Sequence, residues 1–350
     1  MKVIHITAST EYDVLIGSGL LPNLGAELSK VCKPGTAAIV SDSNVWPLYG
    51  EAATAALENA GYRVVNYVFP AGESHKSGAN YLLLLNFLAK KHITRCDCII
   101  ALGGGVVGDI SGFAAATFLR GIAYIQVPTT LLAAVDSSVG GKTAIDLDAG
   151  KNLAGAFYQP RLVLCDTDLL NTLPGDIFRD GCAEVIKYGI LYDEILFANL
   201  MRDGLEFDRE SVIARCVELK RDVVAQDEFD TGARQMLNLG HTVGHAIEAL
   251  SNFAVSHGQA VAMGMAIVTG AAVKYGICGL DTLDAVHRIL RKFQLPAATA
   301  YTAQALFESA LSDKKRLGGT VSLVVPEGIG KCILRQTEVA ELKDFIEAGL

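Results

Sequence analysis

The strongest chemical signal in the sequence is a group of three closely spaced histidines. His241 and His245 occur in the segment NLGHTVGHAIEA, and His257 follows in SHG. Residues four apart lie one turn apart on the same face of a helix, and imidazoles in such a pair commonly bind zinc together with a further donor. The sequence therefore predicts a metal site. The further donor could be His257, Glu248 or a carboxylate from elsewhere, such as Glu184.

A histidine pair at this spacing is also compatible with a hydrogen-bonded feature of the core. The metal interpretation is favoured, because zinc sites commonly combine such a pair with a third donor. Glu184 is a candidate for that donor, since it lies in the predominantly apolar helical run CAEVIKYG, where an unpaired buried carboxylate would be costly.

A glycine-rich segment predicts a second site, for a phosphate group. Gly103, Gly105 and Gly108 satisfy the pattern G-x-G-x-x-G between an expected strand and an expected helix. Such glycines let the backbone approach a pyrophosphate at the N-terminus of a helix. The alternative is that the glycines serve tight packing alone, because the acidic residue that binds ribose in such sites is missing about 20 positions later. Asp42 or Glu73 could bind the ribose instead.

Two lysines stand among glycines and polar residues further along the chain. The run VGGKT, which contains Lys142, resembles the end of a P-loop, but Asp136 replaces the required glycine, so a nucleotide triphosphatase is not expected. Lys142 and Lys151 could be ordinary solvated lysines. Their setting beside Asn152 favours anion binding instead.

Composition limits the remaining possibilities. The 350 residues are 51% hydrophobic and carry a net charge of −8, which suits a globular protein of two domains and excludes a diffuse basic surface for nucleic acid or anionic lipid. The eight cysteines form no CxxC pair, so reduced thiols are expected. The N-terminal segment lacks the features of a signal peptide, which favours a cytoplasmic location. The apolar stretch 260–273 is too short to span a membrane and is expected to be a buried helix.

The order of expected elements predicts the fold class. Apolar, β-rich runs alternate with helical stretches up to residue 166, which is typical of a parallel sheet with crossover helices; they occupy 36–42, 62–70, 96–104, 122–128 and 161–166. After Pro174 the sequence is mostly helical, with one strand expected at 320–326. We expect an α/β domain followed by a mostly helical domain, with a boundary near residue 170.

Several motifs, taken in order, resemble those of 3-dehydroquinate synthases over most of the chain. They are GGGVVGD (103–109), the segment 120–146 with QVPTTLLA and GGKTAID, GKN (150–152), AEVIKYG (183–189), NLGHTVGHAIEA (238–249) and SHG (256–258). The resemblance implies a Rossmann-like NAD-binding domain over 1–170 and a helical metal- and substrate-binding domain over 171–350. It also implies NAD, one zinc or cobalt ion, a homodimer, and 3-deoxy-D-arabino-heptulosonate 7-phosphate as the substrate.

The resemblance assigns roles to individual residues. The metal ligands would be Glu184, His241 and His257, with His245 left as a proton carrier, which differs from the spacing argument that both helix histidines bind metal. NAD would contact Asp42, Asn44, Glu73, Lys76, Gly105, Val106, Val107, Gly108, Asp109, Thr129, Thr130, Lys142, Lys151, Leu169 and Thr172. The substrate would contact Arg120, Lys142, Asn152, Lys187, Lys220, Arg234, Asn238 and the pair Lys314 and Lys315. Arg120 would serve the neighbouring subunit. Phe229 and Asp230 depart from the family pattern, in which an arginine or similar polar residue and a glutamate are expected.

The implied reaction is a phosphate-eliminating lyase reaction of the shikimate pathway, leading to aromatic amino acids. It would proceed by transient oxidation by NAD, loss of phosphate, re-reduction and an intramolecular aldol closure. Three alternatives remain: another sugar-phosphate cyclase, a metal-dependent NAD polyol dehydrogenase, and a catalytically inactive binding protein. Nucleic-acid and membrane partners are not expected.

Overall fold

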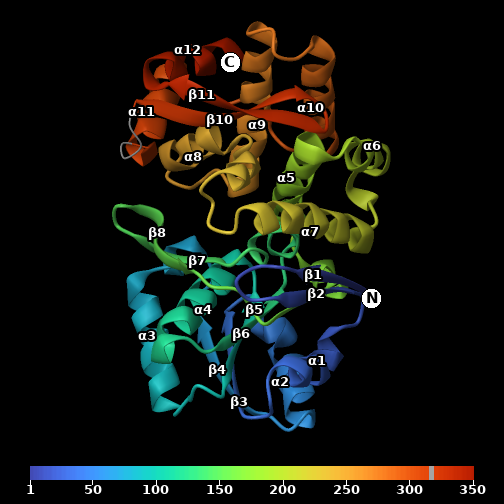
Figure 1. Cartoon of the computed structure of the whole chain (residues 1–350), viewed down its shortest axis with the longest axis vertical. Coiled ribbons are helices and arrows are strands. Elements are labelled where there is room, and N and C mark those ends of the chain that lie inside the picture. The colour runs from blue at the N-terminus through green and yellow to red at the C-terminus, as the bar shows by residue number, and fades with distance from the viewer. Residues whose placement is uncertain (315–318) are drawn as a thin grey trace. The chain divides into compact units, whose positions relative to one another are not determined.

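The computed structural model describes residues 1–314 and 319–350, which form two compact units (Figure 1). The first unit comprises Met1–Leu173 and Arg209–Phe229, and the second comprises Pro174–Asp208 and Asp230–Leu350. The expected fold class, an α/β N-terminal part followed by a mostly helical part, is confirmed.

A seven-stranded sheet forms the centre of the first unit. Its strands, in spatial order, are β1 (Lys2–Ile6), β2 (Tyr12–Gly17), β9 (Leu162–Asp166), β6 (Ala123–Pro128), β5 (Cys98–Gly103), β3 (Thr36–Asp42) and β4 (Arg63–Phe69). β1 pairs antiparallel with β2, and the other neighbours are parallel. Because parallel strands share a direction, their carboxyl ends gather at one edge of the sheet, where ligands of α/β folds bind.

Helices cover both faces of this sheet, which explains why its inner strands are apolar without alternation. On one face, Ile39 and Ile100 pack with residues of α1 (Leu24–Val31) and α2 (Trp46–Asn59). On the other face, Val40 and Ile99 pack with residues of α3 (Gly78–Lys90) and α4 (Gly105–Thr117). Figure 1 shows the two helix pairs on opposite sides of the strands.

The first unit also contains a separate hairpin, one long helix and short helical turns. β7 (Lys142–Leu147) and β8 (Gly150–Phe157) form an antiparallel hairpin that packs on α4. The turns are η1 (Leu21–Asn23), η2 (Glu73–His75), η3 (Phe118–Arg120), η4 (Ala133–Ser137) and η5 (Thr167–Thr172). The helix α7 (Arg209–Gln226) packs on β1, β2 and η4. Its assignment by sequence to the C-terminal part was wrong, because an apolar helix face does not reveal which surface it covers.

The second unit is built around one buried helix, α9 (His257–Lys274). Its other elements are α5 (Gly175–Tyr192), α6 (Glu194–Asp203), η6 (Gly204–Glu206), η7 (Ala233–Asn238), α8 (His241–Leu250), α10 (Leu280–Lys292), α11 (Ala303–Lys314), β10 (Thr320–Gly328), β11 (Lys331–Glu338) and α12 (Val339–Gly349). α9 packs against α5, α8, α10, α12 and β10. The expectation that 260–273 is a buried helix is therefore confirmed.

Glycines allow α8 and α9 to pack with their backbones in contact. A Cβ atom on Gly264 would lie 2.0 Å from the carbonyl oxygen of Gly240, and one on Gly244 would lie 3.1 Å from the backbone of Ala260. Gly240, just before α8, also has a φ of +78°, a backbone conformation that residues other than glycine rarely adopt. Since α8 begins at His241 and α9 begins at His257, this close approach sets the distance between the two histidines.

We predict that Gly264→Ala destabilises the protein by about 1–3 kcal/mol, because its methyl group forces two backbones apart. The melting temperature, measured by circular dichroism, checks the effect. Gly328→Ala is the matched control, since a Cβ there meets nothing within 4 Å. Equal melting temperatures for the two variants would show that the helices can separate without cost.

Candidate active site

Three side chains of the second unit form a group with the donor atoms of a metal site. Glu184 comes from α5, and His241 and His257 are the first residues of α8 and α9. Their ligand atoms all lie within 4.8 Å of one another. Oε1 of Glu184 lies 3.2 Å from Nε2 of His257 and 3.6 Å from Nε2 of His241. We call these three residues the metal triad.

Glu184 is a fully buried carboxylate whose charge is balanced by its neighbours. Lys187, one turn later on α5, is 1% exposed and forms an ion pair with Glu184. Burial alone would raise the pKa of Glu184, but Lys187 and the two triad histidines outweigh it and hold the pKa well below its usual range. The carboxylate is therefore ionised and ready to bind a cation.

The two histidines of the triad present Nε2 to this carboxylate. Nδ1 of His241 lies 3.1 Å from the carbonyl oxygen of Leu239, so it carries the proton and leaves Nε2 as a lone-pair donor. Burial lowers the pKa of His241 to about 3, which keeps this ring neutral. Burial would also lower the pKa of His257, but hydrogen bonds to Glu184 and Glu248 raise it to about 10. A bound cation would displace that extra proton.

The backbone of His257 is fixed by α5, the helix that carries Glu184. Oδ1 of Asp180 accepts hydrogen bonds from the hydroxyl of Ser256, at 2.5 Å, and from the backbone amide of Gln259, at 3.1 Å. Asp180 thus caps the N-terminus of α9 from a neighbouring helix. Asp180 was not predicted from the sequence, where its only signal is its position four residues, or one helical turn, before Glu184.

His245 and Glu248 form a second possible ligand group with His257, and their donor atoms also lie within 4.8 Å of one another. His245 is exposed, whereas Glu248 is 4% exposed. The rings of His241 and His245 are 5.4 Å apart, one turn apart on α8 as the spacing predicts. The structure thus brings all three histidines together and leaves two sets of ligands that share His257.

A cavity of about 430 Å³ opens beside the histidines within the second unit. That volume is in the range of small-molecule sites. Its lining combines α8 and η7 with the strands β10 and β11: Asp230, Gln235, Asn238, His241, Thr242, His245, Thr320, Val321, Ser322 and Gln336. Asn238 and Asp230, both singled out from the sequence, therefore face the same cavity as two of the histidines.

Other predicted substrate residues of this unit do not line that cavity. Arg234 is 2% exposed, so its guanidinium is held inside the protein. Lys187 is committed to Glu184. The side chain of Lys314, and Lys315 altogether, lie outside the described residues.

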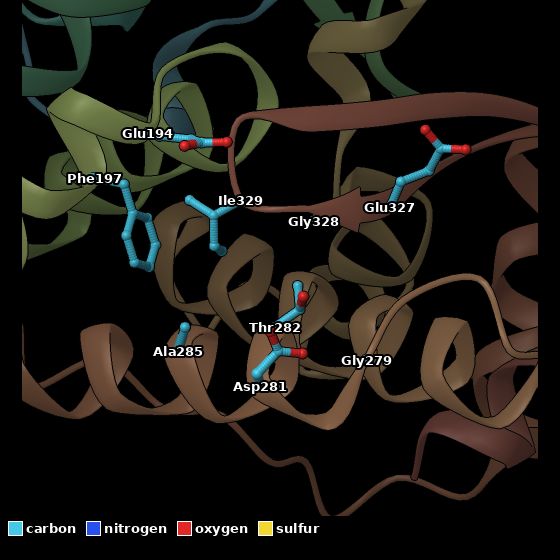
Figure 2. A pocket seen from close by; sticks show the side chains of 9 residues that line it. All are labelled: Glu194, Phe197, Gly279, Asp281, Thr282, Ala285, Glu327, Gly328 and Ile329. Atoms are coloured by element: carbon cyan, nitrogen blue, oxygen red, sulfur yellow. The ribbon is translucent and has the colours of Figure 1, made fainter.

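Figure 2 shows a second hollow of this unit, which contains none of the predicted site residues. Glu194, Asp281 and Glu327 line it, and Glu327 forms an ion pair of 2.9 Å with Lys331. Three carboxylates would repel a phosphate, so this hollow does not suit an anionic substrate.

In the first unit, the predicted NAD residues gather where parallel strands end. Asp42 ends β3, Glu73 follows β4, the glycine-rich turn follows β5, Thr129 and Thr130 follow β6, and Leu169 and Thr172 follow β9. Their contacts shape the turns. The carboxylate of Asp42 accepts a hydrogen bond of 2.8 Å from the backbone amide of Asn44. The hydroxyl of Tyr49 hydrogen-bonds to the hydroxyl of Thr172 and to the carbonyl oxygen of Leu169.

The glycine-rich turn combines packing with an open helix N-terminus. A Cβ on Gly108 would lie 2.7 Å from Oε1 of Gln126, so a larger residue there would require the glutamine side chain to move. At the start of α4, Gly104 offers no side-chain cap, which leaves the helix amides available to an anion. Within the described residues, the buried hydroxyl of Thr129 has no hydrogen-bond partner. Such an atom at the strand ends suits a polar ligand.

Lys76 is buried among three carboxylates instead of facing solvent. Its ammonium lies 2.9 Å from Glu73, 3.3 Å from Asp109 and 3.7 Å from Asp146. Burial would lower the pKa of Lys76, but Asp109 and Glu73 outweigh it and raise the pKa above its usual value. Burial raises the pKa of Asp109 to about 6, although Lys76 opposes the shift. Lys76 therefore organises this edge chiefly by joining η2, α4 and β7.

Two predicted anion-binding residues of this unit are held by aspartates that the sequence analysis did not assign. Lys220 donates to the carbonyl oxygen of Asp136 at 2.7 Å and forms an ion pair with its carboxylate. The backbone amide of Asn152, which has a φ of +55°, donates to Asp146 at 2.8 Å. Asp136, which breaks the P-loop pattern, thus has a structural reason to be there.

Arg120 lies apart from the other predicted residues of the first unit. It is exposed and follows α4, whose first residue is Gly105. Thirteen helical residues span roughly 20 Å, so Arg120 is at the opposite edge of the sheet from the glycine-rich turn. The structure of one chain therefore does not bring Arg120 to that turn.

Comparison with known proteins identifies the family. Family models of the N-terminal and C-terminal parts of 3-dehydroquinate synthase match residues 66–180 and 181–316. The chain belongs to the 3-dehydroquinate synthase family. A 3-dehydroquinate synthase of Pelobacter propionicus is 47% identical over 95% of this chain and 96% of its own length. One from Enterococcus faecalis is 40% identical, with both chains covered completely.

Solved structures of related enzymes share the fold. A 2-deoxy-scyllo-inosose synthase complexed with carbaglucose-6-phosphate, NAD⁺ and Co²⁺ has a TM-score of 0.89 at 26% identity, with both chains covered completely. A 2-epi-5-epi-valiolone synthase from Streptomyces hygroscopicus with NAD⁺ and Zn²⁺ bound has a TM-score of 0.88 at 26% identity, covering 99% of this chain and 98% of its own. A glycerol dehydrogenase from Schizosaccharomyces pombe, at 16% identity and a TM-score of 0.64, shares the fold alone.

Among residues 1–314 and 319–350, no helix combines the length and the apolar character needed to cross a bilayer.

We predict that Asp109 titrates near pH 6 in the unliganded protein, whereas Asp97 titrates below its ordinary value. Burial would raise the pKa of Asp97 too, but the amides of Thr36 and Thr94 donate to it and lower the pKa. The Asp109 contribution to stability is therefore present below about pH 4 and is lost as the pH rises through 6. The Asp97 contribution is lost instead as the pH falls below about 4.

Carboxyl ¹³C NMR of the protein, with Asp109→Asn to assign the signal, measures this difference. A midpoint near 4 for Asp109 would show that its surroundings are more hydrated than the structure indicates.

Proposed function

We propose that this protein is an enzyme that converts 3-deoxy-D-arabino-heptulosonate 7-phosphate to 3-dehydroquinate and phosphate. The observation that carries the proposal is the metal triad of Glu184, His241 and His257, in a chain whose full-length relatives are named 3-dehydroquinate synthase. The related structures with bound NAD⁺ and a divalent metal support the same type of chemistry.

One zinc or cobalt ion would be held by the metal triad. One carboxylate and two imidazoles with free lone pairs are a common donor set for a catalytic zinc ion, and they leave a coordination position for substrate. The NAD residues would be those at the carboxyl ends of the parallel strands. The open N-terminus of α4 and the buried hydroxyl of Thr129 support a dinucleotide there.

When bound, these two groups supply a hydride acceptor and donor and an electrophile that polarises the substrate oxygen. The residues of the chain bind and orient the substrate and move protons. Asn238 faces the cavity beside the histidines and is placed to donate a hydrogen bond to the substrate. His245 faces the same cavity, is exposed, and serves as the proton carrier. Glu184 has no such function, because it stays ionised beside Lys187.

The anionic groups of the substrate would be met by a mixture of direct and supporting residues. We propose that Lys142, which is exposed, and Asn152, whose backbone is held by Asp146, bind the phosphate or carboxylate of the substrate. Lys187, Lys220 and Arg234 are buried. We propose that Lys187 and Lys220 support the site indirectly, by orienting the carboxylates of Glu184 and Asp136, whereas Arg234 and Lys314 supply positive charge for the substrate.

We further propose that the first unit binds NAD, and that the second unit binds the metal and contacts the substrate through Asn238. The enzyme works as a homodimer, in which Arg120 serves the partner subunit; its distance from the glycine-rich turn supports that arrangement. Its location is the cytoplasm, which agrees with eight cysteines that are all free thiols.

A product assay separates this reaction from its rivals. The protein is incubated with the heptulosonate phosphate and NAD, and free phosphate and NADH are followed together. We expect stoichiometric phosphate without lasting NADH, because the hydride is returned. Accumulating NADH would indicate a polyol dehydrogenase. Turnover of a sugar phosphate that lacks the carboxylate, with none of the heptulosonate, would indicate another sugar-phosphate cyclase.

We predict that His245→Ala lowers kcat by roughly 10²- to 10⁴-fold, the usual contribution of a positioned acid or base. Metal content and NAD affinity should be nearly unchanged, and excess zinc or cobalt should not restore the rate. His257→Ala is the contrasting variant, because it should lose most of its metal. The metal content of each variant is measured together with its kcat. If His245→Ala loses its metal and added ion restores part of kcat, His245 is a ligand instead.

A further inference from the structure

The imidazole of His257 lies between two carboxylates from different helices. Its Nε2 is 3.2 Å from Glu184 on α5, and its Nδ1 is 3.3 Å from Oε2 of Glu248 on α8. Both carboxylates are almost completely buried, whereas the side chain of His257 is 32% exposed. The ring is therefore fixed by polar contacts at both nitrogens more than by close packing.

The two nitrogens must have different roles if this ring binds a metal. A metal takes the lone pair of one nitrogen, and the other nitrogen then carries a proton that needs an acceptor. Nε2 faces Oε1 of Glu184, the atom that also faces Nε2 of His241. Nδ1 is the remaining nitrogen, and it points to Glu248.

Glu248 also belongs to the alternative ligand group with His245, so its role must be distinguished from ligation. The ligand group of Glu184 contains a fully buried carboxylate and a second imidazole, that of His241, whose Nδ1 lies against the carbonyl oxygen of Leu239 and leaves Nε2 for a cation. The Glu248 group instead depends on exposed His245. If the metal binds to the Glu184 group, Nδ1 of His257 can still donate a hydrogen bond to Glu248. That hydrogen bond uses the nitrogen through which His257 would have to bind a metal in the Glu248 group.

We infer that Glu248 is a positioning residue, which accepts the Nδ1 proton of His257 and so holds Nε2 toward the metal. This inference rests on the metal triad of the proposed function. The carboxylate also makes Nε2 of His257 a stronger electron-pair donor to the metal. Glu248 touches neither substrate nor NAD in this account and acts only through His257.

Two substitutions test this role by separating hydrogen bonding from volume. Glu248→Gln keeps an acceptor oxygen and nearly the same volume, whereas Glu248→Leu removes the acceptor. We expect Glu248→Leu to bind Zn²⁺ 10- to 100-fold more weakly in competition with a chelator. Glu248→Gln should recover most of that loss. The visible absorption of the Co²⁺-loaded protein should change in Glu248→Leu, because the orientation of one ligand is relaxed.

Two reference variants frame these results. Ser309→Ala removes a 3.3 Å contact to the carbonyl oxygen of Ala246 on the same helix, without touching His257. It should match the unmodified protein in Zn²⁺ affinity and Co²⁺ spectrum. Glu184→Gln removes a proposed ligand and should bind far less metal than any Glu248 variant.

The outcomes separate this inference from the proposed function. If Glu248→Leu binds Zn²⁺ as tightly as Ser309→Ala, the positioning role is wrong, while the product assay is unaffected. If Glu248→Leu loses metal as completely as Glu184→Gln, Glu248 is a ligand and the inference is also wrong. The Zn²⁺ affinity could also decrease from Glu248→Gln to Glu248→Leu to Glu184→Gln in a protein that releases no phosphate from the heptulosonate phosphate. In that case the positioning role is correct and the proposed reaction is wrong.

Discussion

The buried charge of Glu184 is the constraint on which the second unit depends. An ionised carboxylate inside a protein is costly unless cations and hydrogen-bond donors surround it, and removing one partner of such a pair costs on the order of 3–5 kcal/mol. Lys187 and the two triad histidines satisfy that requirement in this chain. A single ammonium would suffice to neutralise the charge. The addition of two imidazoles, each presenting Nε2, is what a bound cation requires.

The surrounding fold makes that arrangement rigid. Gly240 and Gly264 bring α8 and α9 into backbone contact, and Asp180 fixes the start of α9 to α5. All three ligands therefore sit on helices whose mutual positions are fixed by backbone packing between α8 and α9 and by the side chain of Asp180 between α5 and α9. In the first unit the site residues are positioned by parallel strands, whose following loops lie at one edge of the sheet. Ion pairs of Lys76 connect three segments at this edge.

Sequence reasoning found local features that depend on short-range patterns. β3 was predicted at its observed bounds, and the helical pairing of His241 with His245 was confirmed. What it could not supply were long-range partners. The spacing of the histidines nominated His245 as a ligand, whereas the orientation of Glu184 toward His257 depends on helix packing. The family resemblance made that choice, and it stays a prediction, because the structure contains both ligand groups.

The same limit explains the other differences. The edge pairing of β1 with β2, and the hairpin of β7 with β8, were missed because short segments of mixed polarity give weak strand signals. The helix α7 was assigned to the wrong unit, since amphipathicity does not name the surface that a helix covers. Lys76 and Lys220 were predicted as ligand-binding cations, but each is paired with an aspartate that is distant in sequence, Asp109 for Lys76 and Asp136 for Lys220.

The central claim is that Glu184, His241 and His257 together hold one divalent cation. Anomalous diffraction from crystals of the zinc- or cobalt-loaded protein, recorded on both sides of the metal absorption edge, tests it most directly. The account predicts one anomalous peak per subunit at about 2.0–2.2 Å from Nε2 of both histidines and an oxygen of Glu184. A peak bonded to His245 and Glu248, or no peak in crystals that contain the metal in solution, would contradict it.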